Sequence, residues 1–159
     1  MSEFSGALFD RLLQSDEQPG RPTPSGDQRD RMRACIARDL EGLLNTRTAM
    51  PDDLVKSCPH VAASVLNFGL IDFAGMSVGS AEDSARICQA VRIAIERHEP
   101  RLCMVSAAIR PHPGVVNRID FVITAKLTME PQGDPLRFDA VLEPSSLQYS
   151  IRHQRASAR

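Results

Sequence analysis

Apolar residues recur with a helical period in two long segments before residue 100. The apolar positions of the first segment are Met32, Ile36, Leu40, Leu43 and Leu44. Their spacing of four, four, three and one positions predicts an amphipathic helix over about residues 29–45. The second segment begins at Ser80, where Asp83 completes a pattern similar to a capping box, and its apolar stripe predicts a helix that runs to His98.

Between these helices the polar and apolar residues follow no long periodic pattern. Residues 46–60 predict a loop. Residues 61–70 predict about two helical turns that Gly69 closes, with Phe68 directed into the core.

The period changes from 3.6 to 2 after Pro100, which stops the second helix. A mostly apolar run over residues 102–109 predicts a buried strand, and apolar and polar residues alternate over residues 119–128 and 136–143. Residues 147–151 predict a further short strand. Helices followed by an antiparallel sheet predict an α+β fold, in which the N-terminal helices pack on a small sheet formed by the C-terminal half.

The first residues differ in composition from the rest of the chain. Residues 1–14 form a short amphipathic segment whose apolar side chains include Leu8, Phe9 and Leu12. Residues 15–28 contain three prolines, two glycines and no large apolar residue, which is typical of a flexible linker. A short apolar segment on a tether suits docking on a partner, and packing onto its own domain is the alternative that the sequence leaves open.

The predicted organisation therefore has four parts. They are a docking segment (1–14), a linker (15–28), an α+β domain (29–151) and a disordered tail (152–159).

Composition narrows the possible function classes. The 159 residues carry a formal charge of −1 and only 4% aromatic residues, with no Trp. A general nucleic-acid or anionic-membrane binder usually has a basic excess, and a sugar-binding platform usually has more aromatic side chains. The chain has no export signal and no run near the roughly 18 apolar residues of a membrane span, so the prediction is a cytoplasmic protein without membrane insertion.

The side chains that could carry chemistry do not form a recognisable site. The four cysteines lack ligand spacing and are expected to be reduced thiols of the core. The four histidines lie far apart in the chain, and no nucleophile elbow, phosphate loop or zinc helix is present. We therefore predict no catalytic, metal-binding or cofactor-binding residue. The residues instead favour a protein-binding function, in which an exposed edge of the sheet accepts a strand of another chain.

Five stretches, taken in order, resemble one family. They read LFDRL (8–12), DLEGLLNTR (39–47), SVLNFGL (64–70), IDF (71–73) and EPRL (99–102). Together they resemble TssE, the type VI secretion baseplate subunit related to the lysozyme-like wedge proteins of contractile phage tails. One departure is Ile71, where the family commonly has proline.

The resemblance implies a structural function rather than an enzymatic one. Members of the family build the baseplate wedge with TssF and TssG, and TssK is a further candidate partner within the baseplate. Their sheet resembles the interlocking region of a sheath subunit, so this chain is expected to join the membrane-docked baseplate to the first ring of the TssB–TssC sheath and to help initiate sheath assembly.

The same resemblance implies partner-binding residues. Its Glu-Pro-Arg motif corresponds to Glu99, Pro100 and Arg101. An extended chain at Pro100 directs Glu99 and Arg101 to one side, where they form either a solvated ion pair or, as the family implies, a partner contact. Asn45 and Arg47, at the end of the first helix, either cap free carbonyls or contact a partner.

Two other functions remain alternatives. The lysozyme-like label suggests a muramidase that cuts peptidoglycan with two acidic residues, although the missing export signal and the scarcity of aromatic residues count against it. The second alternative is a wedge protein of a phage tail or of another contractile particle.

Overall fold

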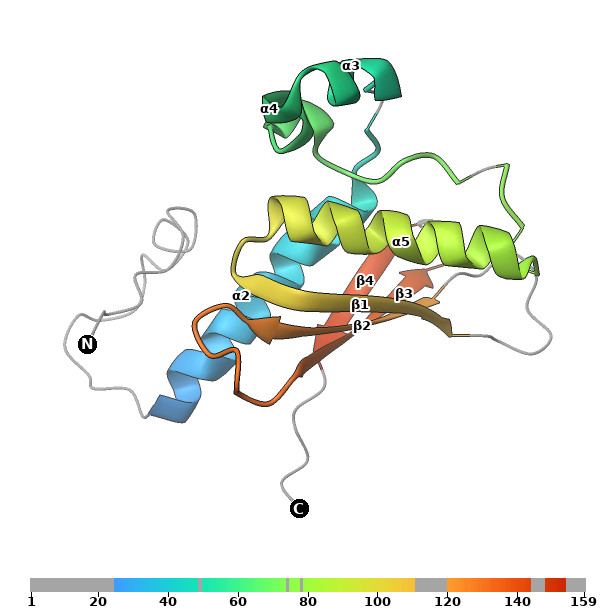
Figure 1. Cartoon of the computed structure of the whole chain (residues 1–159). Helices are drawn as coiled ribbons and strands as arrows, with labels where there is room; N and C mark the ends of the chain where they lie inside the picture. Colours follow the sequence, from blue (N-terminus) through green and yellow to red (C-terminus); the bar gives the residue numbers. More distant parts are fainter. Residues whose placement is uncertain are drawn as a thin grey trace.

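The computed structural model describes residues 25–48, 50–73, 75–77, 79–110, 120–143 and 148–153. Its helices are α2 (Ser25–Asn45), α3 (Asp52–Ser57), α4 (Pro59–Ala62), the short 3-10 helix η1 (Val65–Asn67) and α5 (Ala81–His98) (Figure 1). Its strands are β1 (Leu102–Arg110), β2 (Asp120–Leu127), β3 (Leu136–Glu143) and β4 (Gln148–His153). The predicted docking segment, with Leu8, Phe9 and Leu12, lies outside the described residues.

The four strands form one antiparallel sheet in the order β1-β2-β3-β4. Helix α5 packs on β1, α2 packs on β4, and the two helices also contact each other. The buried apolar residues of the two central strands occupy every second position and point to one side of the sheet: Phe121, Ile123, Ala125, Leu136, Phe138 and Ala140. Both helices therefore cover the same face of the sheet, and the predicted α+β fold is confirmed.

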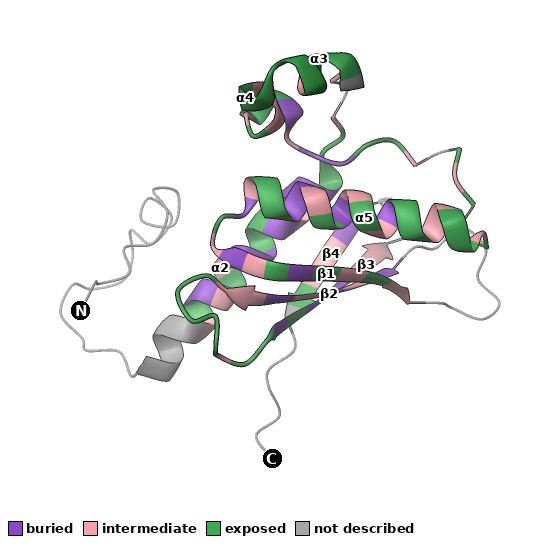
Figure 2. Cartoon of the chain, in the orientation of Figure 1, coloured by how far each residue is buried: buried purple, intermediate pink, exposed green. Residues whose placement is uncertain are grey.

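The core lies between this face and the two long helices. In Figure 2, buried residues gather where α2, α5 and the strands meet. The residues of α2 and α5 that are completely buried are Ile36, Leu40, Leu44, Ile87, Val91 and Ile95. All of them lie on the helical stripes that the spacing predicts, because only one side of each helix meets the sheet.

The ends of the long helices follow the capping signals, with one difference. Helix α2 ends at Asn45 as predicted but begins at Ser25, four residues before the predicted start and inside the predicted linker. At the start of α5 the Ser80 hydroxyl accepts a hydrogen bond from the Asp83 amide at 3.4 Å. The Asp83 carboxylate accepts from the Ser77 amide at 2.9 Å, so it reaches further back than a standard capping box.

The largest difference from the prediction is a helical lobe, formed by α3, α4 and η1, where the sequence predicts mostly a loop. The lobe projects from the body of the molecule, and Leu54, Val65 and Leu66 are exposed on it (Figures 1 and 2). The two helical turns predicted over residues 61–70 correspond to the end of α4 and to η1. Helix α3 was not predicted, because a helix this short that buries few apolar residues has no periodic stripe.

Gly69 fixes the return of the chain from the lobe to the body. Its φ is +119°, and a Cβ atom there would lie 2.6 Å from the carbonyl oxygen of Thr46. The close approach comes from a parallel bridge between Arg47 and Leu70. Only glycine fits this position without strain. Gly69 thus follows the three-residue 3-10 helix η1 and not the two-turn helix that the sequence predicts. Phe68 is half-buried and packs against the core.

Two further expectations need correction. Strand β4 extends to His153, so the first two residues of the predicted tail belong to the sheet. All four cysteines are free, but Cys58 is exposed because it lies between α3 and α4 in the lobe, so the expectation of a core thiol is wrong for it.

Candidate functional site

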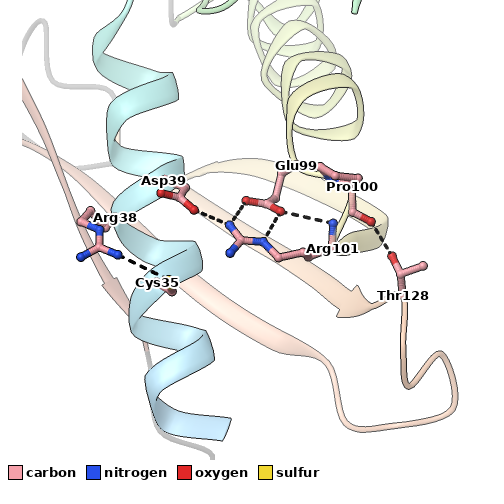
Figure 3. Close-up of polar contacts among 7 residues, drawn as sticks. All are labelled: Cys35, Arg38, Asp39, Glu99, Pro100, Arg101 and Thr128. Atoms are coloured by element: carbon pink, nitrogen blue, oxygen red, sulfur yellow. Dashed lines mark hydrogen bonds and ion pairs between the residues drawn. The ribbon is translucent and has the colours of Figure 1, made fainter. Parts of the chain in front are cut away.

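The predicted Glu-Pro-Arg motif forms the corner between α5 and β1. Glu99 follows the last residue of α5 with a non-helical backbone, φ −124° and ψ 80°. The Leu102 amide donates to the Glu99 carbonyl at 3.1 Å, so the chain makes a tight turn at Pro100 and Arg101 instead of running extended as predicted. Its carboxylate receives two hydrogen bonds from the Arg101 guanidinium, one from Nε to Oε1 at 2.6 Å and one from Nη2 to Oε2 (Figure 3). The Arg101 amide adds a third bond, to Oε1 at 3.2 Å. The predicted pairing of these two charges is therefore present.

Burial makes this pair different from a solvated ion pair. Glu99 is only 4% exposed, although it is a carboxylate. Three hydrogen bonds from Arg101 compensate for the lost hydration of the carboxylate. The corner is thus a structural element as well as a candidate contact.

Asp39 of α2 is the third charged residue of the corner. Nη2 of Arg101 also donates to Oδ2 of Asp39, which lies 62 positions earlier in the chain. The Asp39 side chain is 45% exposed and that of Arg101 is 22% exposed. The hydrogen bond to Glu99 is the main reason why the pKa of Arg101 lies above its ordinary value; burial opposes this shift and Asp39 adds to it.

Thr128 fastens the corner to the end of β2. Its hydroxyl donates to the Pro100 carbonyl at 3.0 Å, and its amide donates to the Arg101 carbonyl at 2.8 Å. Both contacts hold the backbone on either side of the exposed Pro100 ring. We call Asp39, Glu99, Pro100, Arg101 and Thr128 the corner cluster; it joins α2, α5, β1 and the turn after β2 (Figure 3).

The structure places Asn45 against β4. Its side-chain amide donates to the Tyr149 carbonyl at 2.8 Å, and its side-chain oxygen accepts from the Tyr149 amide at 2.7 Å. Two residues along the strand, the Ile151 amide donates to Oε2 of Glu41 at 2.9 Å. Asn45 and Glu41 of α2 therefore take the place of a neighbouring strand along the outer edge of β4.

Arg47 does cap its helix. Its Nη1 donates to the carbonyl of Leu44 at 3.0 Å, in the last turn of α2. The residue is otherwise exposed. Capping is thus present for Arg47, and the alternative of a partner contact stays a prediction for both Asn45 and Arg47.

Each edge strand of the sheet is interrupted, which bears on the predicted addition of a foreign strand. At β4 the amides of Tyr149 and Ile151 are occupied by α2. In β1 the pairing register shifts between Cys103 and Ser106, and Met104 within this irregularity has φ +52°. Bulges and occupied amides are common ways of protecting an edge from unwanted pairing.

Packing explains the shifted pKa values of two further side chains, His98 and Tyr149. Burial lowers the pKa of His98, whose Nε2 lies 3.1 Å from the Asn67 carbonyl oxygen and whose ring meets Phe68 edge-on at 5.3 Å. Burial beside Phe121 raises the pKa of Tyr149 to about 12. Both side chains tie parts of the fold together.

Among the described residues there is neither a metal-binding cluster nor a membrane-spanning helix. No three His, Cys, Asp or Glu side chains gather in a way that could hold a metal ion there. None of the helices among those residues is long and apolar enough to cross a membrane.

Beyond the corner cluster and the edge contacts, the chain has a match among known protein families. Residues 30–132 match GPW_gp25, the family of baseplate wedge protein gp25. The chain therefore belongs to this family of structural baseplate proteins of phage-tail-like particles. The predicted membership of the lysozyme-like wedge family is confirmed. We found no significant match among curated proteins.

Sequence reasoning did not assign Asp39 or the contact between Asn45 and β4. Asp39 stands within the DLEGLLNTR stretch, but 62 positions separate it from Arg101. Asn45 and Tyr149 are 104 positions apart. No periodic or local signal links residues at such distances in a single sequence, so only the packing of α2 reveals these contacts.

Proposed function

We propose that this chain is the TssE-like baseplate subunit of a type VI secretion system. In this function it joins the baseplate wedge to the first ring of the contractile sheath and helps initiate sheath assembly in the cytoplasm. The observation that carries the proposal is membership of the baseplate wedge family over residues 30–132. The proposed partners are TssF and TssG in the wedge, TssB and TssC in the sheath, and TssK as a further baseplate neighbour.

The corner cluster is the proposed contact with the wedge. Nε and Nη2 of Arg101 are held by Glu99 and Asp39, and Nη1 makes no hydrogen bond within the described part of the chain. A guanidinium fixed on two sides and open on the third can donate to a backbone carbonyl oxygen of a partner with little loss of side-chain entropy. Pro100 presents a rigid apolar ring beside it.

A test must separate binding from folding, because Arg101 also stabilises the domain. In the full chain, Arg101→Lys keeps a positive charge but removes the fork of donors, and Arg97→Lys makes the same change at an exposed position of α5 outside the corner cluster. We expect Arg101→Lys to reduce co-purification with TssF and TssG more than tenfold, and Arg97→Lys to change it less than threefold. Equal recovery with Arg101→Lys and wild type, at equal stability, contradicts the proposed contact.

The segment with Leu8, Phe9 and Leu12 is proposed as a second attachment to the wedge, together with Asn45 and Arg47 near the end of α2. Deletion of residues 1–14 leaves α2 complete, because that helix begins at Ser25. We expect unchanged thermal unfolding and a loss of wedge assembly. A large loss of stability would instead show that the segment packs on its own domain.

The nearest alternative is a wedge protein of another contractile particle, since the matched family covers phage baseplates. A pull-down of tagged protein from its host, with partners identified by mass, distinguishes the two: TssF and TssG support the proposal, and tail proteins without them contradict it. We further propose that the chain is not a muramidase. Peptidoglycan clearing by purified protein, abolished by replacing one acidic residue, would overturn that statement.

A further inference from the structure

We propose that the sheet carries a second interaction surface, which binds an acidic surface of a partner protein. It is the face turned away from α2 and α5, and we call it the open face. This inference goes beyond the corner cluster and does not depend on which particle the chain belongs to.

Strand alternation defines the open face. In β2 and β3 the residues that pack against the helices alternate with residues that point the other way. Register continues this face across the sheet: Ala108 pairs with Val122, Val122 with Asp139, and Asp139 with Arg152. No helix within the described ranges packs against it, because α2 and α5 both lie on the opposite face.

Three arginines from three strands gather around one carboxylate on the open face. Nη2 of Arg110 (β1) lies 2.7 Å from Oδ1 of Asp139 (β3), and Nε of Arg137 (β3) lies 3.7 Å from the same oxygen. Arg152 (β4) stands directly opposite Asp139 in the register. Among the described residues, these three arginines are thus grouped near Asp139, and Arg110 also stands opposite Asp120 in the register.

Among the described side chains of this face, positive charges reach solvent and the carboxylates of Asp139 and Asp120 do not. Asp139 is 8% exposed and Asp120, which shares this face, is 1% exposed. The side chain of Arg137 is 49% exposed, and Arg152 is also exposed. Lys126 adds a further cation on the same face, where its ammonium donates to the Pro131 carbonyl at 2.9 Å. Within the described side chains, a partner that approaches this face therefore meets positive charge.

The neighbouring side chains suit a flat protein surface. Ser106, Ala108 and Thr124 lie on the open face and are small, so a partner backbone or short acidic side chains can come close. Guanidinium groups bind carboxylates in a bidentate geometry, and complementary charge raises the association rate. The net charge of −1 and the 4% aromatic content argue for an acidic protein rather than a nucleic acid.

The test replaces the two exposed arginines of the open face, and a control variant replaces two exposed arginines of α5. Arg137→Gln with Arg152→Gln changes the open face, and Arg86→Gln with Arg97→Gln removes the same charge from exposed positions on α5. The probe is a fluorescent peptide of alternating Glu and Thr, and its binding to the full chain is followed by anisotropy at increasing salt. Thermal unfolding of each variant controls for folding, and single substitutions replace the double one if it unfolds.

We expect wild type and the α5 control to bind the peptide with a salt-dependent affinity, and the open-face variant to bind at least tenfold more weakly. Equal losses in both variants, or no loss in either, overturn the proposal. Tighter binding of a single-stranded oligonucleotide of equal charge, dependent on the same two arginines, also overturns it in favour of nucleic acid. Because no Tss protein takes part, failure here leaves the proposed wedge function untouched.

Discussion

The corner cluster and the open face use the same residue types in opposite proportions. At the corner two carboxylates, Glu99 and Asp39, hold one guanidinium. On the open face Arg110 and Arg137 pair with Asp139, and Arg152 stands opposite it in the register. In both places one acid is nearly buried, but the surplus charge at the corner is negative and on the open face it is positive.

This difference separates the corner cluster, a contact that stabilises the fold, from the open face, a docking surface. The hydrogen bonds of the corner cluster join elements distant in sequence and satisfy a buried carboxylate. Their loss should therefore mainly reduce the free energy of unfolding. The exposed arginines of the open face have surplus positive charge that nearby acids do not neutralise. Their loss should therefore mainly reduce the affinity for an acidic partner. Arg101 is the exception within the corner, because one side of its guanidinium stays open.

The strongest test of the comparison is Glu99→Ala. It removes the acceptor of three hydrogen bonds from Arg101 and leaves that guanidinium with Asp39 alone. We expect a loss of about 3 kcal/mol in the free energy of unfolding, measured by denaturant titration. A loss below about 1 kcal/mol would place the pair among ordinary surface ion pairs.

The matching change on the open face is Asp139→Asn. Asn keeps the size and one acceptor for Arg110 but leaves the arginines without their carboxylate. We expect a smaller destabilisation of about 1–2 kcal/mol, because water can hydrate the exposed Arg137. The same variant should bind the acidic peptide more tightly than wild type. Weaker peptide binding by a folded variant would contradict the charge argument.

A smaller effect is expected for Asp39→Asn. Its side chain is 45% exposed, so its ion pair with Arg101 is screened by solvent and salt. We expect a change below about 1 kcal/mol in the free energy of unfolding, which 1 M salt should reduce further. An effect as large as that of Glu99→Ala would mean that the corner acts as one inseparable network.

The smallest effect should be a pH dependence from His98, the residue before Glu99. Burial lowers its pKa, so the folded state favours the neutral ring more than the unfolded chain does. Its contribution to stability is therefore complete above pH 6.5, the ordinary value, and declines as the pH falls below it. Denaturant titration of wild type and His98→Gln between pH 7.5 and 5 measures this, and the variant should lose less stability. An equal decline in both would assign the acid sensitivity to other groups.

The long elements were predictable because their signals are local. Apolar stripes and strand alternation set the buried faces, and the cap at Ser80 and the stop at Pro100 mark the ends of α5. In the helical lobe, turns were predicted over residues 61–70 but α3 was missed, because Leu54 remains exposed and a short helix that buries little leaves no period in the sequence.

The candidate site was predictable only where its parts are neighbours. Glu99 and Arg101 stand two positions apart around a proline, so the sequence predicts their pairing, although a turn and not an extended chain brings the two side chains together. Asp39 joins them only because α2 crosses the sheet beside that corner.

The sequence alone therefore determines the two long helices, the strands with their buried faces, and a pair of opposite charges at one corner, since each depends on residues a few positions apart. Tertiary packing decides what those charges do. It buries Glu99 and brings Asp39 to Arg101, and it gathers arginines of three strands around Asp139. Burial and long-range register set the strength of an electrostatic interaction, and both arise only when distant segments of the chain meet.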